Sequence, residues 1–276
     1  MSGVLRVARA EVYRLLRVRA VWITTIMIAV ASAVTAWASH LEALREGVLD
    51  PIDSGSGWAP LVDGWRAGLV LGVFVTLAHA ARSLAGDRES GVIRFSITRS
   101  ASRSHVLLGR FLAGLVLILS AILVTGAAAY LVAWRVGDFG PFVEDGFEII
   151  GRSEIQAELF RAVISTVPAW LALYAFGLAV SCMAGGATSA VTTALGLFVA
   201  FDLLKGSFGD WGLALFASHL PTLADSSAWA ELPGLVRGYS DAWFDERMMR
   251  VAWTVPWPAL VLVLAVGDLA LRRRAL

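Results

Sequence analysis

Long stretches without charged residues alternate along the chain with short charged stretches. Uncharged stretches lie at 20–39, 111–134 and 251–267, and another at 67–81 is interrupted only by His79. A helix of about 20 residues crosses a bilayer core of roughly 30 Å. These stretches therefore predict membrane-spanning helices.

The stretch between Arg161 and Asp202 is the most informative, because its 40 residues include no Asp, Glu, Lys, Arg or His. At about 1.5 Å per residue it would form roughly 60 Å of helix, twice the bilayer core, so we expect two crossings with a turn between them. The small residues of Ser181–Ser189, with Gly185-Gly186 at the centre, suit that turn. The sequence then predicts six crossings, at 20–38, 65–83, 110–133, 162–181, 188–205 and 251–270.

Residues 4–18 have the pattern of an amphipathic helix. Their arginines gather on one side of a helical wheel and their apolar residues on the other. We expect this helix to lie along the membrane surface before the first crossing, the alternative being a simple charged flank. A signal peptide is disfavoured for the first crossing, since about 18 apolar residues is typical of a spanning helix.

Two segments between crossings carry weaker patterns. Ser153 with Gln156 three residues later resembles a capping box that would start the helix of the fourth crossing. Residues 207–250 contain short apolar groups separated by prolines, which predicts short helices at the membrane interface. Among the tryptophans placed at that interface is Trp65.

Composition supports a membrane protein. The chain has 276 residues, of which 58% are hydrophobic and 16% charged, and its mean hydropathy is +0.71. A soluble domain usually has roughly 45–50% apolar and about 25% charged residues. We therefore expect an all-α, polytopic protein forming one transmembrane domain over 1–276.

The formal net charge of +1 hides a segregation of charge. Arginines cluster in 6–19, 82–110 and 272–274, whereas 39–63 and 135–161 are mainly acidic. Because basic residues accumulate on cytoplasmic segments, both termini are expected in the cytoplasm, with the protein in the inner (plasma) membrane. We do not interpret the arginines as a nucleic-acid surface.

Motifs for catalysis are missing from the sequence. The only lysine, Lys205, lies outside any GxxxxGK[ST] phosphate loop, so this chain is not expected to bind ATP through that motif. HExxH, GxSxG and CxxC are absent, and the four histidines lack the spacing of metal ligands. The sequence predicts neither an enzyme nor a metal site, and a protein driven by ATP would need a separate ATPase subunit.

The segment at 84–109 combines charged residues with an apolar run. Gly86-Asp87-Arg88-Glu89-Ser90-Gly91 precedes Val92–Ile97, and Leu107-Leu108-Gly109-Arg110 leads into the third crossing. A short helix with an apolar ridge and polar edges would suit a groove in another protein. From the residues alone, a solvated connector is an equal alternative.

In these motifs the segment resembles the permeases of ABC-2 type transporters, and the six crossings and basic amphipathic start agree with that resemblance. It differs at Ser100, where such permeases often have proline. The resemblance implies an ABC-2 type permease fold and an ABC exporter, whose dimer, of two copies or of a copy and a paralogue, forms the pathway. ATP and Mg would bind to a partner ATPase subunit. Alternatives are a non-transporting scaffold or assembly factor and a secondary carrier.

The resemblance also implies a coupling helix that contacts the ATPase subunit. Its contact residues would be Asp87, Arg88, Glu89, Ser90, Gly91, Ile93, Arg94 and Arg99. A minor cytoplasmic contact would come from Gly185, Gly186 and Thr188 in the turn between the fourth and fifth crossings. The substrate does not follow from the sequence.

Overall fold

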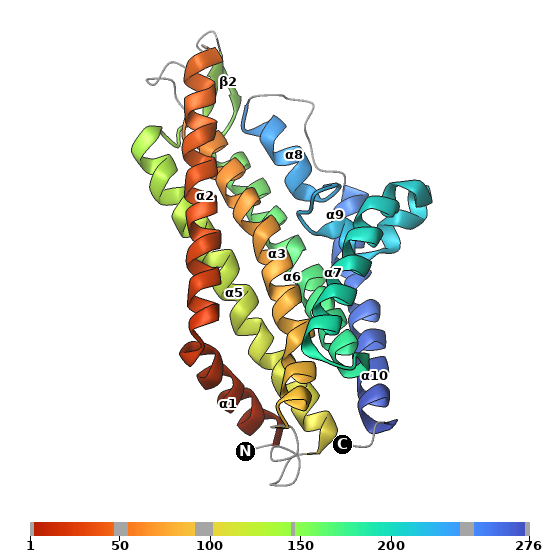
Figure 1. The fold of residues 1–276 in the computed structure, drawn as a ribbon. Helices are drawn as coiled ribbons and strands as arrows, with labels where there is room; N and C mark the ends of the chain where they lie inside the picture. The colour runs from red at the N-terminus through yellow and green to blue at the C-terminus, as the bar shows by residue number, and fades with distance from the viewer. Residues whose placement is uncertain (1–2, 47–54, 92–101, 145–146, 238–245, 274–276) are drawn as a thin grey trace.

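The computed structural model describes residues 3–46, 55–91, 102–144, 147–237 and 246–273 (Figure 1). Nearly all regular structure in these ranges is helical. The long helices are α1 (Gly3–Arg17), α2 (Arg19–Glu46), α3 (Trp58–Glu89), α5 (Arg103–Val136), α6 (Arg152–Met183), α7 (Ala187–Leu204) and α10 (Pro256–Arg273). The short elements are β1 (Phe142–Glu144), β2 (Phe147–Ile150), the 3-10 helices η1 (Lys205–Ala214) and η2 (Phe216–His219), α8 (Ala228–Leu235) and α9 (Glu246–Thr254).

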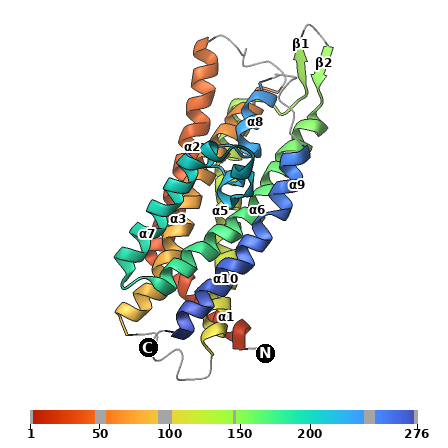
Figure 2. The same ribbon diagram turned by 90° about the vertical axis from the view of Figure 1, so that its right-hand side faces the viewer.

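Six helical segments in the described ranges are long and apolar enough to cross a membrane. They are formed by α2, α3, α5, α6, α7 with η1, and α9 with α10. The segments run side by side, and both chain termini lie at one end of the bundle, which we call the terminal end (Figures 1 and 2). We call the opposite end, which carries β1 and β2, the loop end. The predicted all-α, polytopic fold is confirmed.

The helices extend beyond the apolar stretches that predicted them. α3 continues to Glu89, α5 begins at Arg103, and α6 begins at Arg152. Hydropathy marks only the apolar part of a helix, whereas backbone hydrogen bonds continue into polar residues until a cap ends them. The amphipathic start is a helix as expected, and its apolar side buries Ala8 and Leu15.

α6 is the most buried spanning helix and lies at the centre of the bundle. Its Trp170 is fully buried and donates from Nε1 to Thr76 Oγ1 at 2.7 Å. Close packing of α5 and α6 against α3 depends on small residues: a Cβ added at Gly68 would lie 2.6 Å from Thr125 Cγ2 on α5, and one at Gly72 would lie 3.2 Å from the Trp170 ring on α6. α2, α7 and α10 are much less buried, so their apolar faces are left for lipid or another chain.

The loop end differs from the sequence prediction in three respects. β1 and β2 form an antiparallel hairpin that the sequence did not predict. The N-cap of α6 is Gly151, whose N–H donates to Glu154, so Ser153 and Gln156 do not form the predicted capping box. Short helices do occur within 205–237 and 246–254, but Trp229 is fully buried and packs edge-on against Trp65, so its ring does not reach a membrane interface.

Candidate functional site

The last turn of α3 carries the first of the predicted contact residues. Asp87, Arg88 and Glu89 belong to α3, Ser90 caps it, and Gly91 follows with a φ of +73°, a backbone conformation that favours glycine. Asp87, Arg88 and Glu89 therefore extend a spanning helix. Ile93, Arg94 and Arg99 lie outside the described residues, so the coupling helix stays a prediction.

Asp87 joins α3 to two other helices. Its carboxylate accepts hydrogen bonds from Arg14 on α1, at 3.0 Å to each oxygen, and from Arg110 on α5. Glu11 on α1 completes the group, since its oxygens lie 3.1 Å from Arg14 Nε and from Arg110 Nη2. Arg110 is 3% exposed, so its charge depends on these two carboxylates for compensation.

Arg88 caps the carboxyl end of α6. Its guanidinium donates to the carbonyl oxygens of Ser181, Cys182 and Ala184, at 2.8 Å for the last two. Carbonyl groups in the last turn of a helix lack intrahelical partners and carry partial negative charge, so a cation stabilises them. The Ser181 hydroxyl in turn accepts from the backbone N–H groups of Leu84 and Ala85.

Glu89 performs the opposite role at the start of α7. Its Oε2 accepts the backbone N–H of Ala187 at 2.9 Å, and Gly186 lies beside the same carboxylate. An anion at a helix amino terminus satisfies free N–H groups and interacts favourably with the helix dipole. Arg88 and Glu89 thus fix both sides of the α6–α7 turn, which occurs where the small residues predicted it.

These contacts produce a groove of about 620 Å³ at the terminal end, between the end of α3 and the start of α7. We call it the terminal groove. Its lining residues are Arg82, Gly86, Glu89, Ser90, Ala187, Thr188, Val191 and Thr192. The main and minor contact segments expected from the sequence, almost 100 residues apart in the chain, therefore form one surface.

Sequence reasoning missed part of this surface. Arg82, Val191 and Thr192 line the groove although the sequence analysis did not single them out. Arg82 and Glu89 lie seven residues apart on α3, and Thr188 and Thr192 lie four apart on α7, so helical spacing from the predicted residues would have found them. Gly185 does not line the groove, and no other atom lies within 4 Å of the position its Cβ would take.

The spanning helices and the polar groove at the terminal end together define a multi-pass membrane protein. Residues 5–225 match the family model described as ABC-2 family transporter protein. Because the match covers most of the chain, the protein belongs to the ABC-2 family of transporter proteins and has a role as a transport permease. This confirms the resemblance inferred from the sequence. Among curated proteins, none gives a match.

Proposed function

We propose that the protein is the permease subunit of an ABC exporter, in which two permeases form the translocation pathway and a separate ATPase subunit binds ATP and Mg and drives it. The chain lies in the plasma membrane with both termini in the cytoplasm. The terminal groove carries this proposal, because it combines parts of the two segments that the sequence resemblance assigns to contact with the ATPase.

Contacts around the groove explain how ATP binding would move the spanning helices. A force applied to the end of α3 reaches α1 and α5 through Asp87, and it reaches α6 and α7 through Arg88 and Glu89. Four helices are thus tied to one short stretch of α3 by charge-assisted hydrogen bonds, which are stronger than neutral ones. Motion of the partner subunit would be transmitted to most of the bundle.

The groove geometry also divides the expected contact residues into two groups. Ser90 and Thr188 are exposed and line the groove, so they are available to a partner. Asp87 and Arg88 form hydrogen bonds within the chain, and these bonds link α3 to neighbouring helices. Glu89 does both, because it is exposed and lines the groove while its carboxylate caps α7.

Charge supports the orientation. The terminal end includes the arginines of α1 and those at the end of α10, whereas the loop end includes Asp63, Asp225 and Glu231. Basic residues are concentrated on the cytoplasmic side of membrane proteins. The terminal groove would then face the compartment that contains ATP.

The test is copurification of the tagged permease with a coexpressed candidate ABC ATPase subunit. A tagged double variant, Ser90→Arg with Thr188→Arg, places two bulky cations in the groove. It leaves the side-chain contacts of Asp87, Arg88 and Glu89 in place and removes only the bonds of the Ser90 hydroxyl to its own helix. We expect wild type to retain the ATPase and the double variant to lose it, together with permease-dependent ATP hydrolysis. Ser153→Arg, at the exposed start of α6 and the opposite end of the bundle, is the control and should retain both.

Gel filtration in detergent establishes that each variant is folded. Normal retention of the ATPase by the double variant would exclude the groove as the contact. Failure of wild-type protein to bind the ATPase, or its transport of substrate in vesicles without any ATPase, would overturn the proposed function itself.

A further inference from the structure

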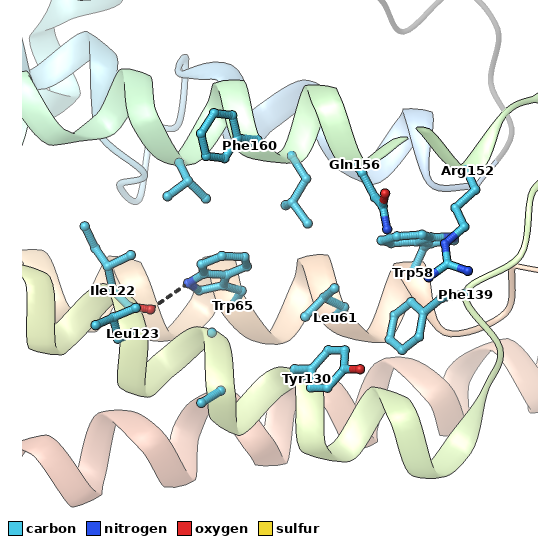
Figure 3. Close-up of a pocket in the computed structure, with 14 residues that line it drawn as sticks. Trp58, Leu61, Trp65, Ile122, Leu123, Tyr130, Phe139, Arg152, Gln156 and Phe160 are labelled. Carbon is cyan, nitrogen blue, oxygen red and sulfur yellow. Dashed lines mark hydrogen bonds between the residues drawn. The ribbon is translucent and has the colours of Figure 1, made fainter. Parts of the chain in front are cut away.

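A second groove lies near the loop end, between α5 and α6, and residues of α3 also line it (Figure 3). We call it the lateral groove, and its volume is about 580 Å³, within the usual range of about 300–1,000 Å³ for small-ligand sites. Aromatic and aliphatic side chains form most of its wall. They are Trp58, Leu61, Trp65, Ile122, Leu123, Tyr130, Phe139, Leu159, Phe160 and Val163.

The indole N–H groups of this wall already donate hydrogen bonds within the protein. Trp65 Nε1 donates to the Ile122 carbonyl at 3.1 Å, and Trp58 Nε1 donates to the Gly140 carbonyl at 2.9 Å. The indole rings therefore offer an occupant carbon surface and no N–H donor. A guest in this part of the groove would be an apolar chain, because a polar one would lose hydrogen bonds without replacement.

The mouth of the groove has different chemistry. Arg152 and Gln156, one turn apart at the start of α6, reach toward Trp58 and Phe139 (Figure 3). Arg152 is exposed and forms no hydrogen bond or ion pair within the described part of the chain. Glu154 on the same turn is occupied by the Gly151 N–H at 3.0 Å. An available guanidinium therefore lies at one end of the aromatic wall of the lateral groove.

We propose that the lateral groove binds an anionic membrane lipid, with one acyl chain along the aromatic wall and the phosphate at Arg152. Phe160 and Leu123 are 64% and 69% exposed, so the lateral groove is open toward the surrounding lipid. An acyl chain gains little by leaving the bilayer for an equally apolar groove. Selectivity must therefore come from the head group. Guanidinium binds a lipid phosphate through two hydrogen bonds, and its attraction is greatest for a head group whose negative charge no choline cation cancels.

The size of the groove argues against a transmembrane helix as the occupant. A helix of about 10 Å diameter would fill 580 Å³ with little more than one turn. Such a short contact, with a guanidinium at its end, suits a lipid better than a second protein.

The test uses purified protein in nanodiscs of phosphatidylcholine and requires no ATPase, so its outcome is independent of the proposed ATPase subunit. A small fraction of the lipid is replaced by a photoreactive probe with a diazirine in the acyl chain, either phosphatidylglycerol or phosphatidylcholine. Labelled residues are located by mass spectrometry. We expect labels on α5 and α6 along the groove, with about fivefold more from phosphatidylglycerol, the ratio expected for one arginine near an anionic lipid.

Two variants separate the head group from the chain. Arg152→Gln should lower the labelling by phosphatidylglycerol to the level of phosphatidylcholine and so remove the preference, whereas Arg135→Gln, at the same end of the bundle but outside the groove, should preserve the preference. Ala127→Phe should fill the lateral groove and reduce labelling by both probes. Ala157→Phe, exposed on α6 and outside the lining, is its control.

Equal labelling by the two probes, or a preference that persists in Arg152→Gln, would overturn the proposal. So would labels spread evenly over α2, α7 and α10 with no enrichment in the groove, or a groove that remains unlabelled while the other helices react, as expected if another protein covers it.

Discussion

Arg14 on α1 and Asp87 on α3 form an ion pair across 73 residues of sequence, with Arg14 Nη1 donating to both carboxylate oxygens at 3.0 Å. Arg110 on α5 shares the same carboxylate. The amphipathic helix is therefore not attached to the bundle by apolar contacts alone. Asp87, at the end of a spanning helix and beside the terminal groove, holds it through Arg14, and the Glu11–Arg110 pair adds a second ionic contact.

Removing that carboxylate should loosen α1. In Asp87→Asn, the buried Arg110 keeps only Glu11 as a counter-charge, and we expect a loss of roughly 1.5–3 kcal/mol, the range for hydrogen bonds to charged groups. The melting temperature in detergent should fall, and proteolysis within α1 should become faster. Asp210→Asn, at an 83% exposed side chain with a 3.6 Å ion pair, is the control and should change neither. An unchanged melting temperature for Asp87→Asn would contradict the role assigned to the pair.

Arg88 should control access to the α6–α7 turn. Cys182 is fully buried there, and its carbonyl accepts from Arg88 at 2.8 Å. In Arg88→Met the carbonyls lose their cation, and we expect maleimide to label Cys182 at least about tenfold faster, since 1.4 kcal/mol of local stability corresponds to a factor of ten.

Arg82→Met is the matched control for that labelling experiment. Arg82 is exposed and forms no hydrogen bond or ion pair with any described residue, so its loss should leave the labelling rate at the wild-type value. Equal rates for the two variants would show that Arg88 does not hold the turn closed.

Close packing at the centre of the bundle should make Gly114 intolerant of a larger side chain. A Cβ there would overlap the buried ring of Tyr174 on α6. We expect Gly114→Ala to destabilise the protein by roughly 1–3 kcal/mol, the usual cost of overpacking. Gly196→Ala on α7, where no atom lies within 4 Å of the added Cβ, should be neutral or slightly stabilising. Fluorescence-detected gel filtration after heating compares the two, and a stable Gly114→Ala would contradict the packing.

His219 should make the loop end sensitive to acid. Burial lowers the pKa of this histidine below its ordinary value of 6.5. Its Nε2 lies 2.9 Å from the Leu213 carbonyl, whereas its buried Nδ1 has no partner among the described residues. A second N–H formed by protonation would therefore lack an acceptor.

The direction of the pH effect on stability follows from the protonation of His219 in the folded and unfolded chains. Well above pH 6.5 the imidazole is neutral in both the folded and the unfolded chain, so it makes no difference to stability. Below that pH the unfolded chain takes up a proton that the folded chain resists, so stability falls. We expect the melting temperature to drop less between pH 7.5 and 5.5 in His219→Gln than in wild type. A parallel drop in both proteins would exclude His219 as the cause, and His40→Gln serves as the control.

Much of the fold followed from the sequence because each helix or turn has a recognisable pattern within a short stretch of residues. Six apolar stretches, the small residues of the α6–α7 turn and the arginine pattern of 4–18 depend on local composition and helical periodicity. Membrane insertion strengthens these signals, since an uncharged stretch of that length has few other stable environments. Where the signal was weak, as in the capping box at Ser153, the prediction was wrong.

The sequence by itself determined the class of protein and singled out the segment that contains Asp87, Arg88 and Glu89. Only the tertiary structure decided what those residues contact, because ion pairs and caps depend on which helix ends meet across 70 to 100 residues of chain. Helix packing also placed Trp229 in the core and opened the lateral groove beside Arg152. Hydropathy measures how apolar a residue is. Which residues it contacts depends on how whole helices pack together.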